Sequence, residues 1–180
     1  MLYNDDVNEY NSTIKGSIDA WYEMNMLPYD EYLEDTIFCN DRSMNNASTN
    51  GWNPDGGMTN KQLQFKEYDE TTDLSCSNIT DKFSVSNDKA KLTYKVGLMS
   101  APEMNLLNNS NIRKAGEYYW LASTSSFGNY DAYVHYVASL GDFSYNYVVY
   151  TNGTRPSVSL APLTEYVDGD GSMARPFIVN

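Results

Sequence analysis

The sequence is short of the residues that catalysis and metal binding most often use. Its 180 residues include one histidine, His135, and two cysteines, Cys39 and Cys76. One histidine without a nucleophile elbow does not indicate a Ser-His-Asp site, and two cysteines without Cys-x-x-Cys spacing do not complete a zinc site with it. No glycine-rich phosphate loop precedes a helix. The sequence therefore predicts no catalytic residues, no bound metal and no cofactor.

Positive charge is also scarce, with 12 Lys and Arg residues against 24 Asp and Glu residues and a net charge of -12. Nucleic acids and anionic membrane surfaces are bound through clustered Lys and Arg, so we expect neither as a partner. No run of about eighteen apolar residues occurs, so we expect no direct insertion of this segment into a membrane.

The start of the chain lacks the basic and apolar regions of a signal peptide. Either the protein is intracellular, or a leader and an upstream segment precede Met1. We favour the second interpretation because the sequence opens just before a helix, and we therefore expect the C-terminal part of a longer surface protein.

The two cysteines lie 37 positions apart in loop-rich sequence. A disulfide that closes this irregular segment is one interpretation, and a loop of this size gains about 3 to 4 kcal/mol in the loop-entropy model. Two unrelated buried thiols are the alternative. A disulfide would place the protein outside the cytoplasm, because structural disulfides persist in oxidising compartments.

A first helix is expected over residues 12–25, where apolar side chains recur at helical spacing. Ser12 is its expected N-cap, and Pro28 is expected to close it. Residues 39–87 are then rich in Asn, Ser, Thr, Gly and Asp, which predicts a long loop region.

A second, short helix is expected to begin after Ser100 and to end near Leu107. Ser100 and Glu103 have the spacing of a capping box, in which each side chain bonds the backbone N–H of the other residue. The apolar run over residues 92–99 predicts a strand that leads directly into this helix.

The last third of the chain consists of short β-branched and aromatic runs separated by glycines, which is typical of an antiparallel meander. The expected strands are residues 118–122, 132–138, 145–150, 157–160 and, after a turn, 176–179. This order of elements indicates an α+β fold with two short helices, long loops and a C-terminal antiparallel sheet. The length favours one domain over residues 1–180.

Five segments, in the same order, carry a resemblance to known proteins; they are residues 38–43, 96–103, 119–123, 153–160 and 169–171. They resemble a family of bacterial surface and pilin-like proteins, a branch of the C-type lectin fold related in architecture to the formylglycine-generating sulfatase modifiers. The chain also resembles the variable proteins of diversity-generating retroelements, whose ligand-binding face precedes a Gly-x-Arg-Pro segment. Here that segment is Gly153-Thr154-Arg155-Pro156, with Thr154 where Val is usual.

The resemblance implies that residues 123–150 form a binding surface, with the Trp120 strand and the Arg155-Pro156 strand as framework. Tyrosine gives stiff contact area and Ser, Asn and Gly give adaptable hydrogen bonding, as in antibody loops. Strand alternation assigns Ala132, Val134 and Val148 to the core. The expected exposed, ligand-binding set is Ser126, Asn129, Tyr130, Asp131, Tyr133, His135, Asp142, Ser144, Tyr145, Asn146 and Tyr147.

The codon pattern is consistent with diversification of this stretch. Adenine-directed mutagenesis of AAC-type codons never produces Lys, Glu, Gln, Met or Trp, and none of these five occurs in residues 121–164. They make up about a quarter of the residues before Leu121. The alternative is that a sheet rich in Tyr, Ser and Val simply disfavours them.

The sequence thus predicts a non-enzymatic receptor or adhesion domain at the cell surface, on a pilus tip or on a phage particle. Its expected partner is a protein or glycan. The alternative is a structural surface or pilus subunit that uses the same face to pack against a neighbour. Sulfatase-modifier activity is not carried over, because those enzymes use a reactive cysteine pair late in the chain, whereas Cys39 and Cys76 lie early. Calcium-dependent sugar binding is not implied either, since the Glu-Pro-Asn and Gln-Pro-Asp tripeptides are absent.

Overall fold

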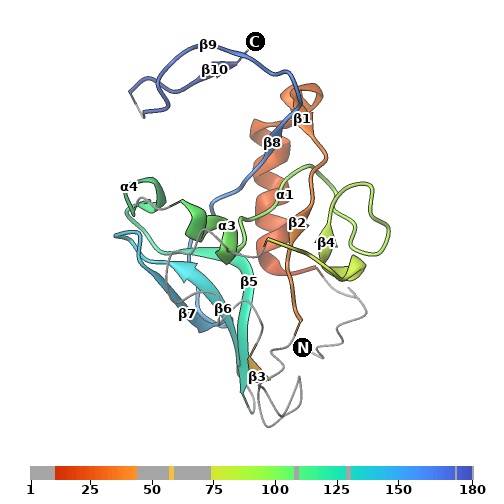
Figure 1. Ribbon diagram of the computed structural model, residues 1–180, viewed down its shortest axis with the longest axis vertical. Helices are drawn as coiled ribbons and strands as arrows, with labels where there is room; N and C mark the ends of the chain where they lie inside the picture. Colours follow the sequence, from red (N-terminus) through yellow and green to blue (C-terminus); the bar gives the residue numbers. More distant parts are fainter. Residues whose placement is uncertain are drawn as a thin grey trace.

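The computed structural model describes residues 11–43, 57–58, 74–107, 110–128, 131–172 and 174–179. It is a mixed α+β structure with few helices and several small antiparallel sheets (Figure 1). The predicted α+β class is therefore confirmed. Most of the predicted loop region lies outside the described residues. Within the described ranges, no helix has the length and apolar character needed to span a bilayer.

The first helix, α1 (Thr13–Asn25), forms where the apolar spacing predicts it. Ser12 is its N-cap, and its Oγ accepts a hydrogen bond from the Lys15 N–H at 3.2 Å. The buried side chains are Ile18 and Tyr22, one turn apart. Pro28 does not end α1. It lies instead at the start of a following 3₁₀ helix, η1 (Leu27–Tyr32), where a missing N–H is tolerated.

The second predicted helix, α3 (Ala101–Leu106), has the predicted capping box. Glu103 N–H donates to Ser100 Oγ at 3.3 Å, and Ser100 N–H donates to Glu103 Oε2 at 2.7 Å. The Ala101 N–H donates to Ser123 Oγ at 2.9 Å, which attaches the start of α3 to the sheet. A further short helix, α4 (Ser110–Arg113), was not predicted.

The prediction of a strand over residues 92–99 is wrong. In the described part of the chain this segment makes one isolated antiparallel bridge, from Gly97 to Ser157. It turns at Tyr94, whose carbonyl accepts from the Val96 N–H at 2.8 Å. Val96 and Leu98 are buried against α1 rather than in a sheet, so burial and not strand pairing explains these apolar positions.

The main sheet has four antiparallel strands in the order β3-β5-β6-β7. They are, listed in chain order, β3 (Gly57–Met58), β5 (Tyr119–Gly128), β6 (Asp131–Val137) and β7 (Phe143–Tyr147). The meander prediction is confirmed for β5, β6 and β7. The fourth strand, β3, comes from the region predicted as loop.

The strands predicted over residues 157–160 and 176–179 are shorter and lie outside the main sheet, as β8 (Ser159–Leu160) and β10 (Ile178–Val179). Each pairs with a strand that was not predicted, β8 with β1 (Leu33–Glu34) and β10 with β9 (Tyr166–Asp168). A third two-stranded sheet, also not predicted, joins β2 (Phe38–Cys39) to β4 (Lys82–Phe83). A 3₁₀ turn, η2 (Ile79–Asp81), precedes β4. Figure 1 shows β9 and β10 at the end of the molecule opposite β3, beyond α1.

Both faces of the main sheet are covered near the start of β5. On one face Tyr119 and Leu121 pack with residues of α3, including Met104. On the other face Trp120 packs with Ile18 of α1. Successive β5 residues thus alternate between the two cores, as expected of a strand.

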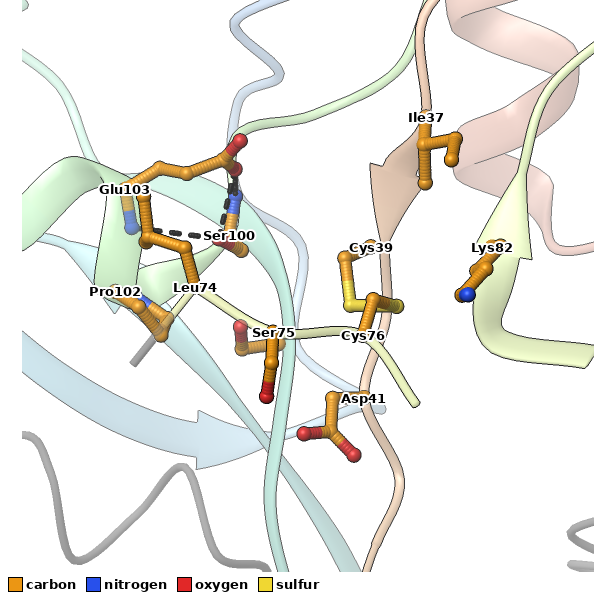
Figure 2. A pocket seen from close by; sticks show the side chains of 11 residues that line it. Ile37, Cys39, Asp41, Leu74, Ser75, Cys76, Lys82, Ser100, Pro102 and Glu103 are labelled. Carbon is orange, nitrogen blue, oxygen red and sulfur yellow. Dashed lines mark hydrogen bonds between the residues drawn. A yellow bond between two sulfur atoms is a disulfide. The ribbon is translucent and has the colours of Figure 1, made fainter. Parts of the chain in front are cut away.

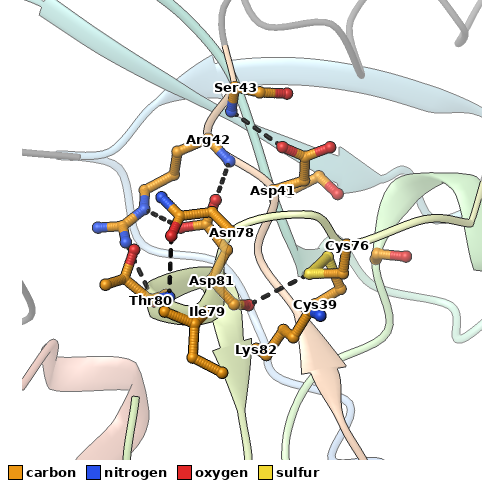
Figure 3. Close-up of a disulfide and its surroundings, with 12 residues drawn as sticks. Cys39, Asp41, Arg42, Ser43, Cys76, Asn78, Ile79, Thr80, Asp81 and Lys82 are labelled. Atoms are coloured by element: carbon orange, nitrogen blue, oxygen red, sulfur yellow. Dashed lines mark hydrogen bonds and ion pairs between the residues drawn. A yellow bond between two sulfur atoms is a disulfide. The ribbon is translucent and has the colours of Figure 1, made fainter. Parts of the chain in front are cut away.

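The predicted disulfide joins Cys39 and Cys76 (Figure 3). It closes a segment of 37 positions, most of which lies outside the described residues. Next to it, the Arg42 guanidinium donates from Nε to Asp81 Oδ1 at 2.6 Å, and the Arg42 backbone N–H donates to Oδ2 at 3.0 Å. Asp81 is buried, so this ion pair fixes the chain beside the disulfide in a water-poor setting.

Candidate ligand-binding face

Three of the predicted tyrosines are brought together by the pairing of β6 with β7. Tyr133 lies directly opposite Tyr147, and His135 lies opposite Tyr145. Directly opposed residues of an antiparallel pair project from the same face, as do residues two apart on one strand. The register therefore places the tyrosine side chains at 133, 145 and 147 on one side of the sheet.

These rings are in contact with one another. The ring centroids of Tyr133 and Tyr147 are 4.5 Å apart, and those of Tyr133 and Tyr145 are 5.9 Å apart in an edge-on arrangement. Tyr150 lies in the turn after β7, and its ring centroid is 6.0 Å from that of Tyr147. Tyr145 is 48% exposed and Tyr150 is 55% exposed. We call this cluster of Tyr133, Tyr145, Tyr147 and Tyr150 the tyrosine face.

The neighbouring Tyr147 hydroxyl favours the protonated form of Tyr133. Hydrogen bonding with Tyr147 first, and then desolvation, raises the pKa of Tyr133 to about 12. Negative charge on Asp131 contributes to the same rise. Rings that sit on paired strands and pack against each other lose little freedom when they contact a ligand.

Two predicted polar residues flank the tyrosine face. Ser126 of β5 pairs with Tyr133, so it lies on the same side of the sheet. Asp131, two residues before Tyr133, is exposed. No Lys or Arg occurs in residues 115–154. The strands β5, β6 and β7 that form the face and its edges therefore carry no positive charge.

His135 is not exposed as the sequence predicts, but only 1% exposed. It lies on the same side of β6 as Tyr133, with its ring 6.2 Å from that of Tyr145. Burial lowers the pKa of His135 to about 4, and a hydrogen bond with the Ser144 backbone partly opposes this. The prediction is wrong because strand alternation determines only the side of the sheet from which a side chain projects. It does not determine whether that side is open to solvent, and at position 135 it is not.

Other members of the predicted set lie elsewhere. Ser144 and Asn146 pair with Tyr136 and Val134, so they project from the face that packs toward α1, and both are half-buried. Asp142 is exposed in the turn before β7, and its carbonyl accepts from the Ala138 N–H at 2.7 Å. Asn129 and Tyr130 lie outside the described residues.

The sequence prediction missed part of the exposed surface after β7. It extended the strand to residue 150 and assigned Val148 to the core, whereas Val148 is exposed and Val149 is 83% exposed. The strand ends at Tyr147 because the Tyr150 N–H turns back to the Tyr147 carbonyl, at 3.1 Å. Alternation cannot be extended through such a turn.

A separate pocket of about 320 Å³ lies beside the disulfide (Figure 2). Asp41, Lys82 and Glu103 line it together with Cys39 and Cys76. The Glu103 carboxylate already caps α3, and Asp41 Oδ1 accepts from the Ser43 N–H at 2.9 Å. Their roles in holding the backbone explain both carboxylates without a ligand.

Among the described residues, no group of three or more His, Cys, Asp and Glu side chains is placed to hold a metal ion.

Comparison with known proteins finds no protein-family model, no curated protein and no solved structure that matches this chain.

Proposed function

We propose that this protein is a non-enzymatic ligand-binding domain of the receptor or adhesion type, and that the tyrosine face contacts its ligand. The observation that carries the proposal is the contact of Tyr133 with both Tyr145 and Tyr147 on paired strands. Tyrosine gives large contact area with few rotatable bonds, and its hydroxyl supplies a hydrogen bond. Such residues dominate the energy of many protein interfaces.

We further propose that the α+β architecture is the C-type lectin fold and that the protein works outside the cell, on a cell surface, pilus tip or phage particle. The helices α1 and α3 packed on an antiparallel sheet support the fold. The Cys39–Cys76 disulfide supports an oxidising compartment.

Diversification of the face is part of the proposal. The whole tyrosine face falls within residues 121–164, which lack Lys, Glu, Gln, Met and Trp. If the face is diversified, the changes should fall on its exposed positions and spare the buried ones. Positions 131, 133, 145 and 147 are expected to differ between near-identical copies of the gene, while the buried His135 and Val137 stay constant. Changes spread evenly along the chain would contradict this part of the proposal.

A binding experiment tests the proposal directly. The protein is applied to an array of glycans and an array of extracellular proteins, and each signal is repeated with Tyr145→Ser and Tyr147→Ser. We expect at least one ligand whose binding falls by about thirtyfold or more in both variants, the usual size of an interface hot spot.

Tyr166→Ser is the matched control, because Tyr166 is an exposed tyrosine on the separate β9–β10 hairpin. It should leave binding unchanged. Two results would argue against the tyrosine face as the binding surface. One is an equal loss of binding in Tyr166→Ser, and the other is a set of ligands whose binding is the same in the wild type and in both face variants.

The second candidate function is a structural surface or pilus subunit. It is favoured by the β9–β10 hairpin, whose Tyr166, Phe177 and Ile178 are all exposed. A two-stranded hairpin is marginally stable alone, so a neighbouring subunit that covers it would stabilise it. Sedimentation that shows concentration-dependent oligomers, lost in Phe177→Ser but kept in Tyr147→Ser, would favour this function over the first.

A further inference from the structure

Three cations of the C-terminal half come from two segments that lie side by side. Between residues 96 and 174 the only Lys and Arg residues are Arg113, Lys114 and Arg155. The chain as a whole carries a net charge of -12. The Arg155 Nη1 donates to the Ile112 carbonyl at 3.0 Å, which brings Arg155 next to the segment that carries Arg113 and Lys114.

A pocket lies between the two segments that carry these cations. Its volume is about 320 Å³, and its lining includes Lys114, Glu117, Tyr118, Gly153, Thr154 and Arg155. The segments are joined through the backbone, since the Gly153 N–H donates to the Tyr118 carbonyl at 2.8 Å and the Trp120 N–H donates to the Gly153 carbonyl at 3.1 Å. A Cβ at position 153 would lie 3.1 Å from the Tyr118 carbonyl oxygen, so glycine permits this close approach. The wall of the pocket is thus fixed by main-chain bonds.

Arg155 is anchored at one corner of its guanidinium group. Nη1 makes both of its bonds, to the Ile112 carbonyl and to the Tyr119 hydroxyl at 3.3 Å. Neither Nε nor Nη2 bonds any residue in the part of the chain that the structure describes. Both guanidinium groups lie over an aromatic ring, Arg155 over Tyr119 and Arg113 over Phe143. In Arg113, however, Nε donates to the Gly141 carbonyl at 2.9 Å and Nη1 to the Leu107 carbonyl at 2.6 Å. Arg155 is therefore the arginine whose paired Nε and Nη2 donors are left for a ligand.

The remaining lining groups suit the other parts of a sugar ring. Tyr118 is 50% exposed and offers an apolar surface, and Thr154 offers a hydroxyl. Glu117 accepts hydrogen bonds only, which suits ligand hydroxyl groups and opposes a second negative charge. Lys114 donates to Asn111 Oδ1 at 3.0 Å and has two further N–H donors. The volume is at the lower end of known ligand pockets, about 300 Å³, which fits one monosaccharide unit.

We propose that this pocket binds a carboxylate-bearing monosaccharide unit, such as a uronic or sialic acid residue of a glycan. Arg155 receives the carboxylate through Nε and Nη2, the paired donors that match carboxylate geometry. Tyr118 contacts the ring, and Glu117 and Thr154 bond its hydroxyls. The site is distinct from the tyrosine face, and its occupation does not depend on that face having a ligand.

The test is an NMR titration of the ¹⁵N-labelled protein with glucuronic acid, N-acetylneuraminic acid, glucose and inorganic phosphate. We expect saturable shifts of the Tyr118, Gly153 and Thr154 amides with at least one acidic sugar, in the millimolar range, and none with glucose. Arg155→Met should weaken that binding by about tenfold or more, because a charged hydrogen-bond pair is lost. Glu117→Gln should weaken the sugar but not phosphate.

Arg175→Met is the matched control, since Arg175 is an exposed arginine on the β9–β10 turn, and it should bind as the wild type does. If thermal unfolding shows that Arg155→Met does not fold, Glu117→Gln carries the test alone, because Glu117 is exposed and is proposed to bond the ligand hydroxyls. The proposal is overturned if neither acidic sugar gives saturable shifts, if Arg175→Met loses as much affinity as the pocket variants, or if phosphate binds as tightly as the sugar and Glu117→Gln strengthens both.

Discussion

The buried imidazole of His135 meets the exposed ring of Tyr145 edge-on, with their centroids 6.2 Å apart and their planes at 82°. This contact places a titratable group directly behind the tyrosine face. Because His135 is the only histidine of the chain, its protonation can be followed without ambiguity.

We expect His135 to stay neutral in the folded protein down to a pH of about 4. Its pKa in the unfolded chain is near the ordinary 6.5, so between these values the unfolded state binds the extra proton and folding stability falls as the pH falls. The loss over this window reaches about 3 kcal/mol. The single histidine C2–H resonance measures the folded pKa, and urea unfolding at several pH values measures the loss. His135→Gln should flatten the stability profile between pH 6.5 and 5, and a folded pKa near 6.5 would show that His135 is not buried.

Tyr147→Phe should lower the pKa of Tyr133 from about 12 toward the ordinary 10. The variant keeps the ring but removes the hydroxyl that bonds Tyr133 and holds its proton. Alkaline NMR titration of ¹³Cζ-labelled tyrosine gives the value. Tyr166→Phe, on the distant hairpin, should leave the Tyr133 pKa unchanged, and an unchanged pKa in Tyr147→Phe would mean that the two hydroxyls are not bonded.

Arg42→Met should reduce the free energy of unfolding by about 3 to 5 kcal/mol, because it leaves the buried Asp81 carboxylate without its cation. Burial already raises the pKa of Asp81, and the bonds and charge of Arg42 oppose that rise. In the variant the opposition is gone, so the deficit should be greatest at neutral pH and shrink as Asp81 takes up a proton in acid. Lys91→Met, at an exposed surface pair, is the control and should cost less than about 1 kcal/mol.

Opening the disulfide, by the Cys39→Ser, Cys76→Ser double variant, should destabilise the protein by about 3 to 4 kcal/mol, because it releases a long loop of the unfolded chain. Denaturant unfolding of the wild type with and without a reducing agent should give the same difference. The reducing agent should not change the free energy of unfolding of the double variant. If it also leaves that of the wild type unchanged, the two cysteines do not form a disulfide in the protein as prepared.

Local signals in the sequence predicted the elements that depend on local chemistry. The Ser12 cap, the Ser100–Glu103 capping box and the β5–β6–β7 meander are each determined within a few residues of chain. The Cys39–Cys76 bond was also predicted, because the loop around it needed a cross-link.

The elements that the sequence did not predict depend on contacts between distant segments. Residues 92–99 are apolar because they lie against α1, and no local pattern distinguishes that from strand pairing. His135 is buried because its side of the sheet is closed to solvent at that position. Val148 is exposed because β7 ends at Tyr147 and the chain then turns. The Arg155 pocket joins segments about forty residues apart in a chain with few cations, and only the fold brings them together.

The pairing of β1 with β8 has a consequence for how the protein is made. Leu33, which is buried against α1, lies opposite Leu160, so the two sides of this core are more than a hundred residues apart in the sequence. On the ribosome, this contact forms only after Leu160 has emerged, and closing so long a loop is slow. Fragments that end before residue 160 should therefore lack the β1–β8 pairing beside α1.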